Sequence, residues 1–228
     1  RPIAGAPLSS LESPLTLAEG LCLLEEGLMI LHQIHAERDF KSGEPLLHLS
    51  IRPDSIWRGE DGGLYFLNPL TPTWIELNAQ LRKKALDGLD GCEAPELTRG
   101  RSGVSTDLYS FGMSVLSSLS GLTPKRVDDR LQAGCFFSHD LSLPNEVEPF
   151  LTQLTAFRAS ARFPSAQSAL TALRGLPESL RIELPPLAEL DVSTPSSLTN
   201  GASTSGAPTS GAPTSGAPNS SAPNSGSP

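Results

Sequence analysis

The sequence has few cysteines, few aromatic residues and no long apolar run. Its three cysteines are odd in number and widely spaced, which argues against a disulfide framework and predicts reduced thiols in a cytoplasmic protein. No apolar stretch reaches the roughly 20 residues that span a bilayer, so direct membrane insertion is not expected. The chain start also lacks the basic and apolar regions that together make a signal peptide.

Positive charge is scarce as well. The 17 Lys and Arg residues stand against 25 Asp and Glu residues, which gives a formal net charge of −8. This acidic balance argues against nucleic acid as a partner, because phosphate backbones are bound by basic surfaces. Other proteins are the partners we expect, and no cofactor or metal is predicted.

Charge is absent altogether after Asp191. From Thr204 a five-residue unit, Thr-Ser-Gly-Ala-Pro, repeats toward the C-terminus. Such a segment has almost nothing to bury, so burial cannot offset the conformational entropy lost on ordering. We expect residues 200–228 to be a disordered low-complexity linker and residues 179–199 to be an extended connector.

The chain does contain apolar periodicity that is typical of helices. Leucines recur at intervals of four and three residues from Leu17 to Leu31, which predicts a helix over residues 16–35. Two short β-type runs, residues 55–57 and 64–67, flank a turn sequence and predict a hairpin. Three further helical stripes are Leu108, Phe111, Val115 and Leu119; Val147, Phe150, Leu151 and Leu154; and Ala166, Ala169, Leu170 and Leu173. The expected fold is mainly α with a small β element.

Six short motifs occur in a fixed order along the folded part. The first is residues 48–56, His-Leu-Ser-Ile-Arg-Pro-Asp-Ser-Ile. The others are Asn68-Pro69-Leu70, Ala94-Pro95-Glu96, Ser105-Thr106-Asp107-Leu108-Tyr109-Ser110-Phe111-Gly112, Gly121-Leu122-Thr123-Pro124 and Arg162-Phe163-Pro164-Ser165-Ala166. Each motif alone is weak, but their common order is specific.

Together the motifs resemble the C-terminal lobe of a Ser/Thr protein kinase: the catalytic loop H-R-D-L-K-P-x-N-I, then D-F-G, A-P-E, the start of the central helix, G-x-x-P and R-x-P-S-A. The resemblance assigns residues 15–178 to this lobe and makes residues 1–14 a remnant of the connection to an upstream N-terminal lobe. No glycine-rich loop or V-A-I-K strand precedes the first helix, so whether that lobe lies upstream or is absent stays open. The altered loop and its leucine-rich approach also resemble the Scy-like pseudokinases.

The positions that carry catalysis in the family have different chemistry here. By resemblance, Ser50 stands where a kinase has the Asp that accepts the substrate's proton, and Ser55 and Asn68 stand where Asn and Asp hold two magnesium ions. Serine is not a carboxylate at any accessible pH, and hydroxyl and amide groups offer Mg²⁺ only neutral oxygens. Arg52 replaces the loop Lys. Together with His48 these residues form a degenerate loop and a degenerate metal position, and ATP binding is doubtful.

The positions that support the loop are retained. The resemblance implies a buried ion pair between Glu96 and Arg162, which ties the activation segment to the last helices. It also implies that Asp107 accepts backbone N–H groups of the catalytic loop and that His48 completes a hydrophobic column beneath it. The alternative for Glu96 and Asp107 is that they are exposed acids at helix starts.

Two other constellations compete with this assignment. Residues 38–41, Arg-Asp-Phe-Lys, imitate R-D-L-K but lack the Asn five positions later, so Asp39 is interpreted as a solvated residue of a loop over residues 37–45. His32 and His35 are three residues apart on one predicted helix. No third metal ligand accompanies them in the sequence, so they are interpreted as ordinary surface or core histidines.

The sequence therefore predicts a pseudokinase that is not an enzyme and acts as a protein-interaction scaffold or regulator. Retained supports and lost chemistry are what such a scaffold would combine. Two alternatives stay open. One is an atypical Ser/Thr kinase with an ATP-binding N-terminal lobe upstream and a rearranged base, and the other is a nucleotide-binding sensor without phosphoryl transfer.

Overall fold

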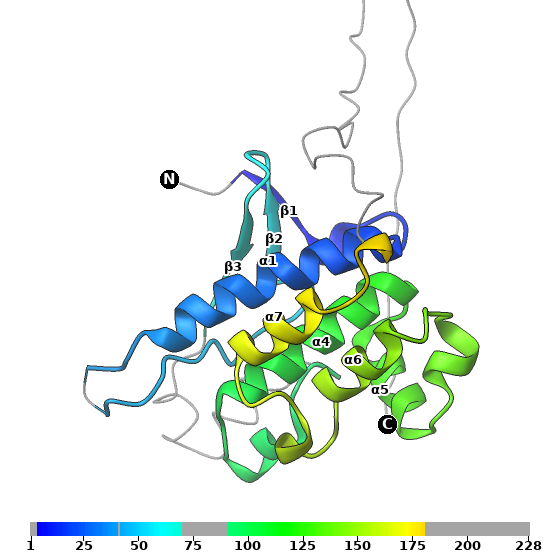
Figure 1. Cartoon of the computed structure of the whole chain (residues 1–228). Helices are drawn as coiled ribbons and strands as arrows, with labels where there is room; N and C mark the ends of the chain where they lie inside the picture. Colours follow the sequence, from blue (N-terminus) through cyan, green and yellow to red (C-terminus); the bar gives the residue numbers. More distant parts are fainter. Residues whose placement is uncertain (1–3, 41, 70–90, 181–228) are drawn as a thin grey trace, which may run out of the picture. The chain divides into compact units, whose positions relative to one another are not determined.

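The computed structural model describes residues 4–40, 42–69 and 91–180. Helices dominate these residues and a small antiparallel sheet accompanies them, which confirms the predicted fold class (Figure 1). Three predictions fall outside the described residues: the linker over residues 200–228, the connector beyond residue 180, and Leu70 of the Asn68-Pro69-Leu70 motif. No helix in the described ranges is both long and apolar enough to cross a membrane.

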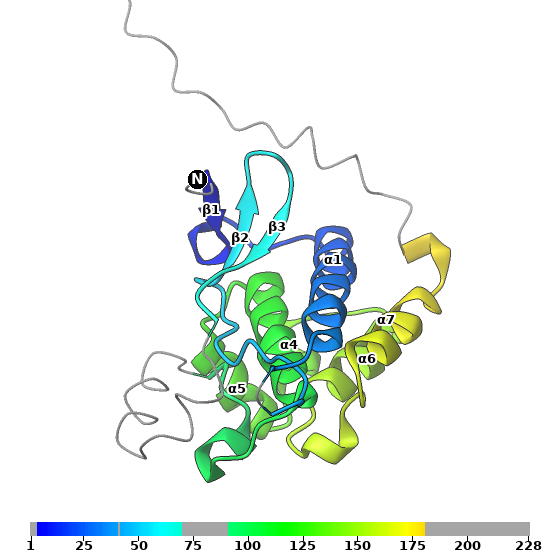
Figure 2. The same ribbon diagram turned by 90° about the vertical axis from the view of Figure 1, so that its left-hand side faces the viewer.

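The sheet contains the predicted hairpin and one further strand. Strands β2 (Ile56–Gly59) and β3 (Leu64–Phe66) pair antiparallel, with Trp57 opposite Tyr65. Strand β1 (Gly5–Pro7) pairs with the other edge of β2, so the strand order is β1-β2-β3. The sequence of β1 has no alternating apolar pattern, which is why it was not predicted. Its pairing brings the N-terminal segment beside the hairpin (Figure 2).

Helix α1 (Leu17–Ala36) matches the predicted helix closely. A capping box begins it: the Thr16 hydroxyl accepts a hydrogen bond from the backbone N–H of Glu19, and the Glu19 carboxylate accepts one from the backbone N–H of Thr16. Four leucines of the predicted stripe are buried, while Leu17 is partly buried. The buried leucines are Leu21, Leu24, Leu28 and Leu31.

Helix α4 (Val104–Ser120) is the centre of the fold, and every residue from Thr106 to Leu119 is buried. It packs against α1 at two glycines of that helix. A Cβ atom on Gly27 would lie 2.1 Å from Cζ of Phe111, and one on Gly20 would lie 2.6 Å from Cδ2 of Leu119. These two glycines therefore let α1 and α4 approach closely enough to bury large side chains of α4.

Three further helices complete the described fold. The third and fourth apolar stripes form α6 (Val147–Leu154) and α7 (Ala166–Arg174), as predicted, and α7 lies along α1 (Figure 1). Helix α5 (Pro124–Gln132) was not predicted because Val127 is its only buried residue. Short helices are η1 (Leu8–Ser10), η2 (Pro95–Arg99), η3 (Phe136–Asp140), η4 (Ala159–Ala161) and η5 (Glu178–Leu180).

The contact between Gly27 and Phe111 gives the first testable prediction. Gly27→Ala should destabilise the fold by about 1–3 kcal/mol, because overpacking outweighs the better helix propensity of Ala. Urea unfolding of the variant and of wild type measures the change. Gly103→Ala is the control for overpacking: a Cβ atom there meets nothing within 4 Å, so the cost should stay below about 1 kcal/mol, that of a weaker N-cap of α4. Equal losses for the two variants would contradict the packing argument.

Candidate functional site: a kinase-type loop held by Asp107

The loop over residues 48–56 is held in place by the carboxylate of Asp107, which is fully buried in the first turn of α4. Asp107 Oδ2 accepts a hydrogen bond from the backbone N–H of His48 at 2.8 Å, and Oδ1 accepts one from Leu49 at 2.7 Å. Leu49 has a φ of 57°, a left-handed conformation that is costly for a residue with a branched side chain. The two bonds to Asp107 offset that cost and set the path of the loop.

His35 is the residue of this site that the sequence interpretation missed. The interpretation as a surface or core histidine did not include its contact with Asp107: its Nε2 lies 2.9 Å from Asp107 Oδ2. The ring is buried and comes from the last turn of α1. Asp107 therefore joins α1, α4 and the loop. Asp107 and His35 are 72 positions apart in the chain. Sequence periodicity predicts contacts within one helix or strand, so it gives no sign of this contact.

The side chain of His48, the first residue of the loop, is buried and faces the hairpin. Its ring meets Phe66 of β3 edge to face, with centroids 5.9 Å apart, and Phe66 in turn lies 5.5 Å from the ring of Phe111. This stack continues into α4, beneath the loop. Burial lowers the pKa of His48 from its ordinary value, against the opposing effect of the Asp107 carboxylate, which favours the neutral ring.

Ser55 closes the loop internally. Its hydroxyl lies 2.9 Å from the carbonyl oxygen of Ser50 and 3.0 Å from that of Arg52, and it accepts a hydrogen bond from the backbone N–H of Arg52 at 3.0 Å. Only 2% of Ser55 is exposed, and Ser50 is buried as well. The hydroxyl of Ser55 is thus committed to the backbone of its own loop.

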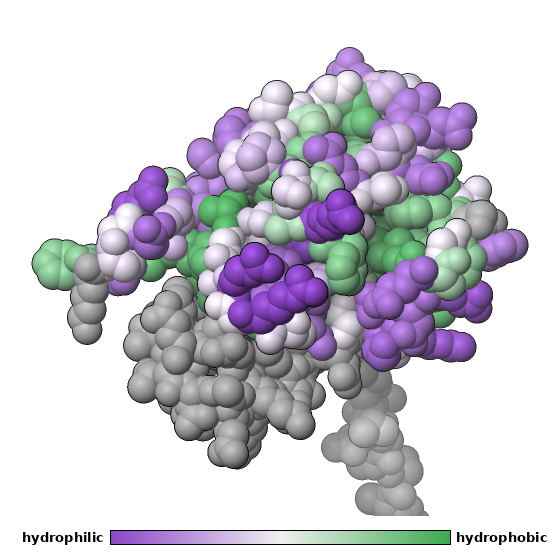
Figure 3. Space-filling view, turned by 90° about the horizontal axis from the view of Figure 1, so that it is seen from below, coloured by the Kyte–Doolittle hydropathy of each residue, from purple (hydrophilic) through white to green (hydrophobic). Residues whose placement is uncertain are grey.

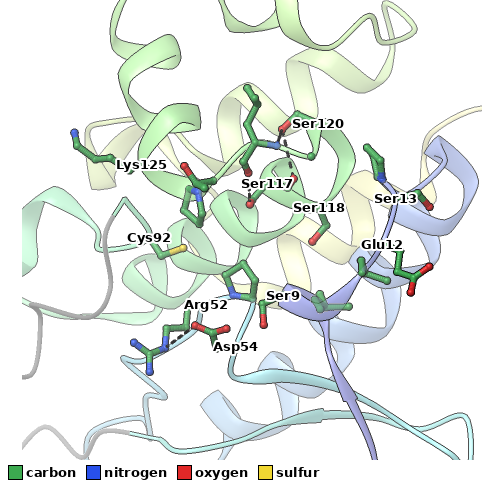
Figure 4. A pocket seen from close by; sticks show the side chains of 18 residues that line it. Ser9, Glu12, Ser13, Arg52, Asp54, Cys92, Ser117, Ser118, Ser120 and Lys125 are labelled. Atoms are coloured by element: carbon green, nitrogen blue, oxygen red, sulfur yellow. Dashed lines mark hydrogen bonds and ion pairs between the residues drawn. The ribbon is translucent and has the colours of Figure 1, made fainter.

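Arg52 and Asp54 lie at the outer side of the loop, beside a cavity of about 780 Å³ (Figure 4). Arg52 Nε is 4.0 Å from Asp54 Oδ2, and most of the Asp54 side chain is exposed. The N-terminal segment, Cys92, the end of α4 and the start of α5 form the other walls. The backbone N–H of Ser9 donates to the carbonyl oxygen of Pro53 at 3.3 Å, so the N-terminal segment is attached to the loop at this cavity.

Asn68 follows β3 and is exposed. Its φ of 59° lies in the left-handed region, which Asn adopts more readily than most residues. The preceding residue is anchored to the loop, because the backbone N–H of Leu67 donates to the carbonyl oxygen of Ser55 at 2.8 Å. Asn68 is therefore brought to the vicinity of the loop but offers only a neutral amide. Over residues 4–40, 42–69 and 91–180, no three His, Cys, Asp or Glu side chains are grouped as metal ligands.

Asp39, the rival to Ser50, is occupied within its own turn. Its carboxylate accepts hydrogen bonds from the backbone N–H and the hydroxyl of Ser42, and its backbone N–H donates to Glu44. An isolated bridge between Arg38 and Pro45 closes this loop at its base. The geometry is that of a local turn that projects from the end of α1.

Glu96 and Arg162 form a bidentate ion pair on the other side of the first turn of α4. Arg162 Nη1 lies 2.7 Å from Glu96 Oε1, and Nη2 lies 3.0 Å from Oε2. The Arg162 side chain is fully buried, and that of Glu96 is 13% exposed. The remaining Arg162 N–H groups donate to the carbonyl oxygens of Ala156, Ser105 and Phe157. All five guanidinium donors are therefore satisfied.

The first turn of α4 carries both the residue that binds Glu96 and the residue that holds the loop. The hydroxyl of Thr106 donates to Glu96 Oε1 at 2.9 Å, and the next residue, Asp107, holds the loop. The ring of Tyr109 packs on the Arg162 guanidinium, 4.5 Å from its carbon, which adds a cation–π contact. Burial would raise the pKa of Glu96, but hydrogen bonds and charge from Arg162 outweigh it and lower the pKa below 4.5.

The buried ion pair gives a stability prediction. Glu96→Ala should destabilise the fold by roughly 3–5 kcal/mol, because it leaves the buried guanidinium of Arg162 without its counter-charge. Asp129→Ala is the control, since it removes an equally short but exposed pair with Lys125 and should cost at most about 1 kcal/mol. Chemical denaturation measures both. A small loss for Glu96→Ala would mean that this pair does not anchor the fold.

The lowered pKa of Glu96 gives a pH prediction. A carboxyl group whose pKa falls on folding stabilises the fold above its unfolded pKa, and this contribution disappears as the pH falls through the folded pKa. The stability gap between wild type and Glu96→Gln should therefore be constant near neutral pH and shrink below pH 4.5. Urea titrations across this range measure the gap. A gap that widens toward acid pH would contradict the assignment.

Comparison with known proteins supplies the remaining information. No family model matches the chain. The chain is 24% identical over 182 residues to Serine/threonine-protein kinase D of Synechocystis sp., and the match covers 76% of this chain and 34% of that protein. It is 24% identical over 155 residues to Serine/threonine-protein kinase PknA of Nostoc sp., and this match covers 64% of this chain and 26% of that protein. The chain thus spans about a third or less of the length of these relatives.

Solved structures agree with the fold described above. The kinase domain of PknI from Mycobacterium tuberculosis matches with a TM-score of 0.53 at 16% identity, and a second structure of that domain matches with 0.51 at 18%. Each match covers 76% of this chain and 62% of the kinase domain. The Scy-like resemblance is not among these relatives and stays a prediction. By its motifs and these relatives, the chain is similar to Ser/Thr protein kinases, and its fold matches that of kinase domains.

Proposed function

We propose that the chain is a catalytically impaired kinase-like domain, a pseudokinase, that acts by binding other proteins. The observation that carries this proposal is the loop closed by Ser55. Its hydroxyl is buried and engaged with the backbone at both Ser50 and Arg52. Ser55 therefore serves the shape of the loop at a position where phosphoryl transfer needs a metal ligand, and Ser50 stands where it needs a carboxylate.

The magnitude of the missing chemistry supports the proposal. General base catalysis is worth about 10²- to 10⁴-fold in rate, and metal ions add charge stabilisation at the phosphoryl oxygens. Ser50 is not a base at neutral pH, and Asn68 offers a metal only a neutral amide oxygen, whereas Mg²⁺ favours carboxylates. If both contributions are lost, phosphoryl transfer falls below a useful rate.

The retained supports favour a folded binding domain. Asp107 still holds the loop through two backbone N–H groups, and Glu96 still pairs with Arg162. These interactions maintain the surface of the domain and do not take part in chemistry. A surface maintained without catalysis is what a scaffold or regulator of other proteins requires.

An active Ser/Thr protein kinase is the competing proposal, and the printed names of the two curated relatives favour it. Within residues 48–56, Asp54 is the single carboxylate, and 64% of its side chain is exposed. Asp54 is therefore the residue that a rearranged base would use. A nucleotide-binding sensor without phosphoryl transfer is a third proposal. No specific contact among the described residues favours it.

A phosphoryl-transfer assay separates the first two proposals. The full-length natural protein, given radiolabelled ATP, Mg²⁺ and generic protein substrates, should transfer no phosphate above a mock purification, because Ser50 cannot act as a base. An Asp54→Asn variant is assayed beside it. Transfer by wild type that is lost in Asp54→Asn would refute the pseudokinase proposal and identify the rearranged base.

A further inference from the structure

A second cavity, of about 710 Å³, lies away from the loop, at the lower end of the molecule in Figure 1. Its walls are η2 and the residues that follow it, the first turn of α4, one face of α5, and residues 157–160. Figure 3 shows the molecule from this end, where strongly hydrophilic side chains gather. Neither the catalytic-loop resemblance nor the proposed function assigns a role to this cavity.

Three arginines line the cavity with their charges uncompensated. Arg99, Arg101 and Arg158 are exposed, and none of them makes an ion pair or side-chain hydrogen bond within the described part of the chain. Arg162, a few residues away in sequence, shows the contrast, since all five of its N–H groups are engaged. The cavity thus presents up to fifteen free guanidinium N–H groups, five from each arginine.

The acidic residues of the cavity cancel these three positive charges only in part. Glu96 is neutralised by Arg162. Asp128, on α5, accepts a hydrogen bond from Gln132 at 2.8 Å and lies 3.9 Å from Lys125. Glu93 carries the remaining carboxylate, and one of its oxygens is buried without a hydrogen-bond partner among the described residues. The positive side of the cavity is therefore formed by η2, the residues after it and residue 158.

Aromatic residues lie beside the arginines. Phe157 is 63% exposed and lines the cavity next to Arg158. Tyr109 is 4% exposed and lines the same cavity. Burial and the nearby Asp128 raise the pKa of the Tyr109 hydroxyl, so it keeps its proton. Arg, Tyr and Phe are the residue types enriched in protein–protein interfaces.

We propose that this cavity is a docking site for an extended segment of a partner protein that carries an anionic side chain, a phosphate or a carboxylate. The anionic group would be bound by Arg99, Arg101 and Arg158, and a neighbouring apolar side chain would pack on Phe157. Guanidinium groups bind phosphate and carboxylate oxygens in pairs, which suits both groups. The three arginines determine that the bound group is anionic. Phe157 determines that an apolar side chain of the same peptide lies next to that group.

A peptide fits the site better than a nucleic acid or an anionic membrane. The whole chain carries a net charge of −8, which repels extended polyanions, whereas one anionic side chain is held within a concave site. The site does not depend on whether the loop transfers phosphate. Its test and the transfer assay can therefore fail independently.

The test measures binding of the complete 228-residue chain to three pools of fluorescein-labelled twelve-residue peptides. Each pool has random flanks and a fixed central residue: phosphoserine, aspartate or serine. The phosphoserine pool, the aspartate pool or both should bind about tenfold tighter than the serine pool, and this advantage should weaken with added salt. The ranking of the first two pools tells whether phosphate is required or a carboxylate suffices.

Matched variants locate the site. Arg99→Gln/Arg158→Gln should abolish the advantage of the anionic pools without a change in melting temperature, because both residues are exposed and neither makes an ion pair with another described residue. Arg126→Gln is the control, since Arg126 is exposed on α5 but does not line the cavity, and it should leave binding intact. Equal affinity of all three pools, no binding of any pool, or equal losses for the variant and its control would overturn the proposal.

Discussion

The buried carboxylate of Asp107 is the constraint on which the arrangement of the site depends. A fully buried charge is costly unless its lone pairs are occupied, and here two backbone N–H groups and His35 occupy them. The loop backbone is therefore tied to α4 whatever side chains the loop carries. The adjacent Thr106 binds Glu96, so a single helical turn positions both the loop and η2.

This division of labour explains how the loop keeps its shape with serines at positions 50 and 55. The shape is set by backbone groups bound to Asp107 from below and by the hydroxyl of Ser55 from within. Neither contact involves the side chain of Ser50, so a serine at that position does not disturb the loop. Structural support and chemistry are carried by different atoms, and one can be lost while the other is retained.

Much of the fold could be predicted from local patterns. The stripes that became α1, α4, α6 and α7 recur at helical spacing, and the hairpin has a turn sequence between two β-type runs. The failures have physical causes. Helix α5 buries only Val127 and so shows no stripe, and β1 forms because β2 offers it an unpaired edge rather than because of its own sequence. His35 looked ordinary, since its role depends on a partner far along the chain.

The sequence by itself determined the order of the motifs, the helical stripes and the identity of the groups at each loop position, because these are properties of residue type and spacing. Only the tertiary structure decided which groups meet. It buried Asp107 against the loop, turned the Ser55 hydroxyl onto its own backbone, and placed Arg99, Arg101 and Arg158 around one cavity without an ion pair among the described residues, while Arg162 was fully bonded. Contacts of this kind join residues that are distant in sequence, and packing, not local preference, selects them.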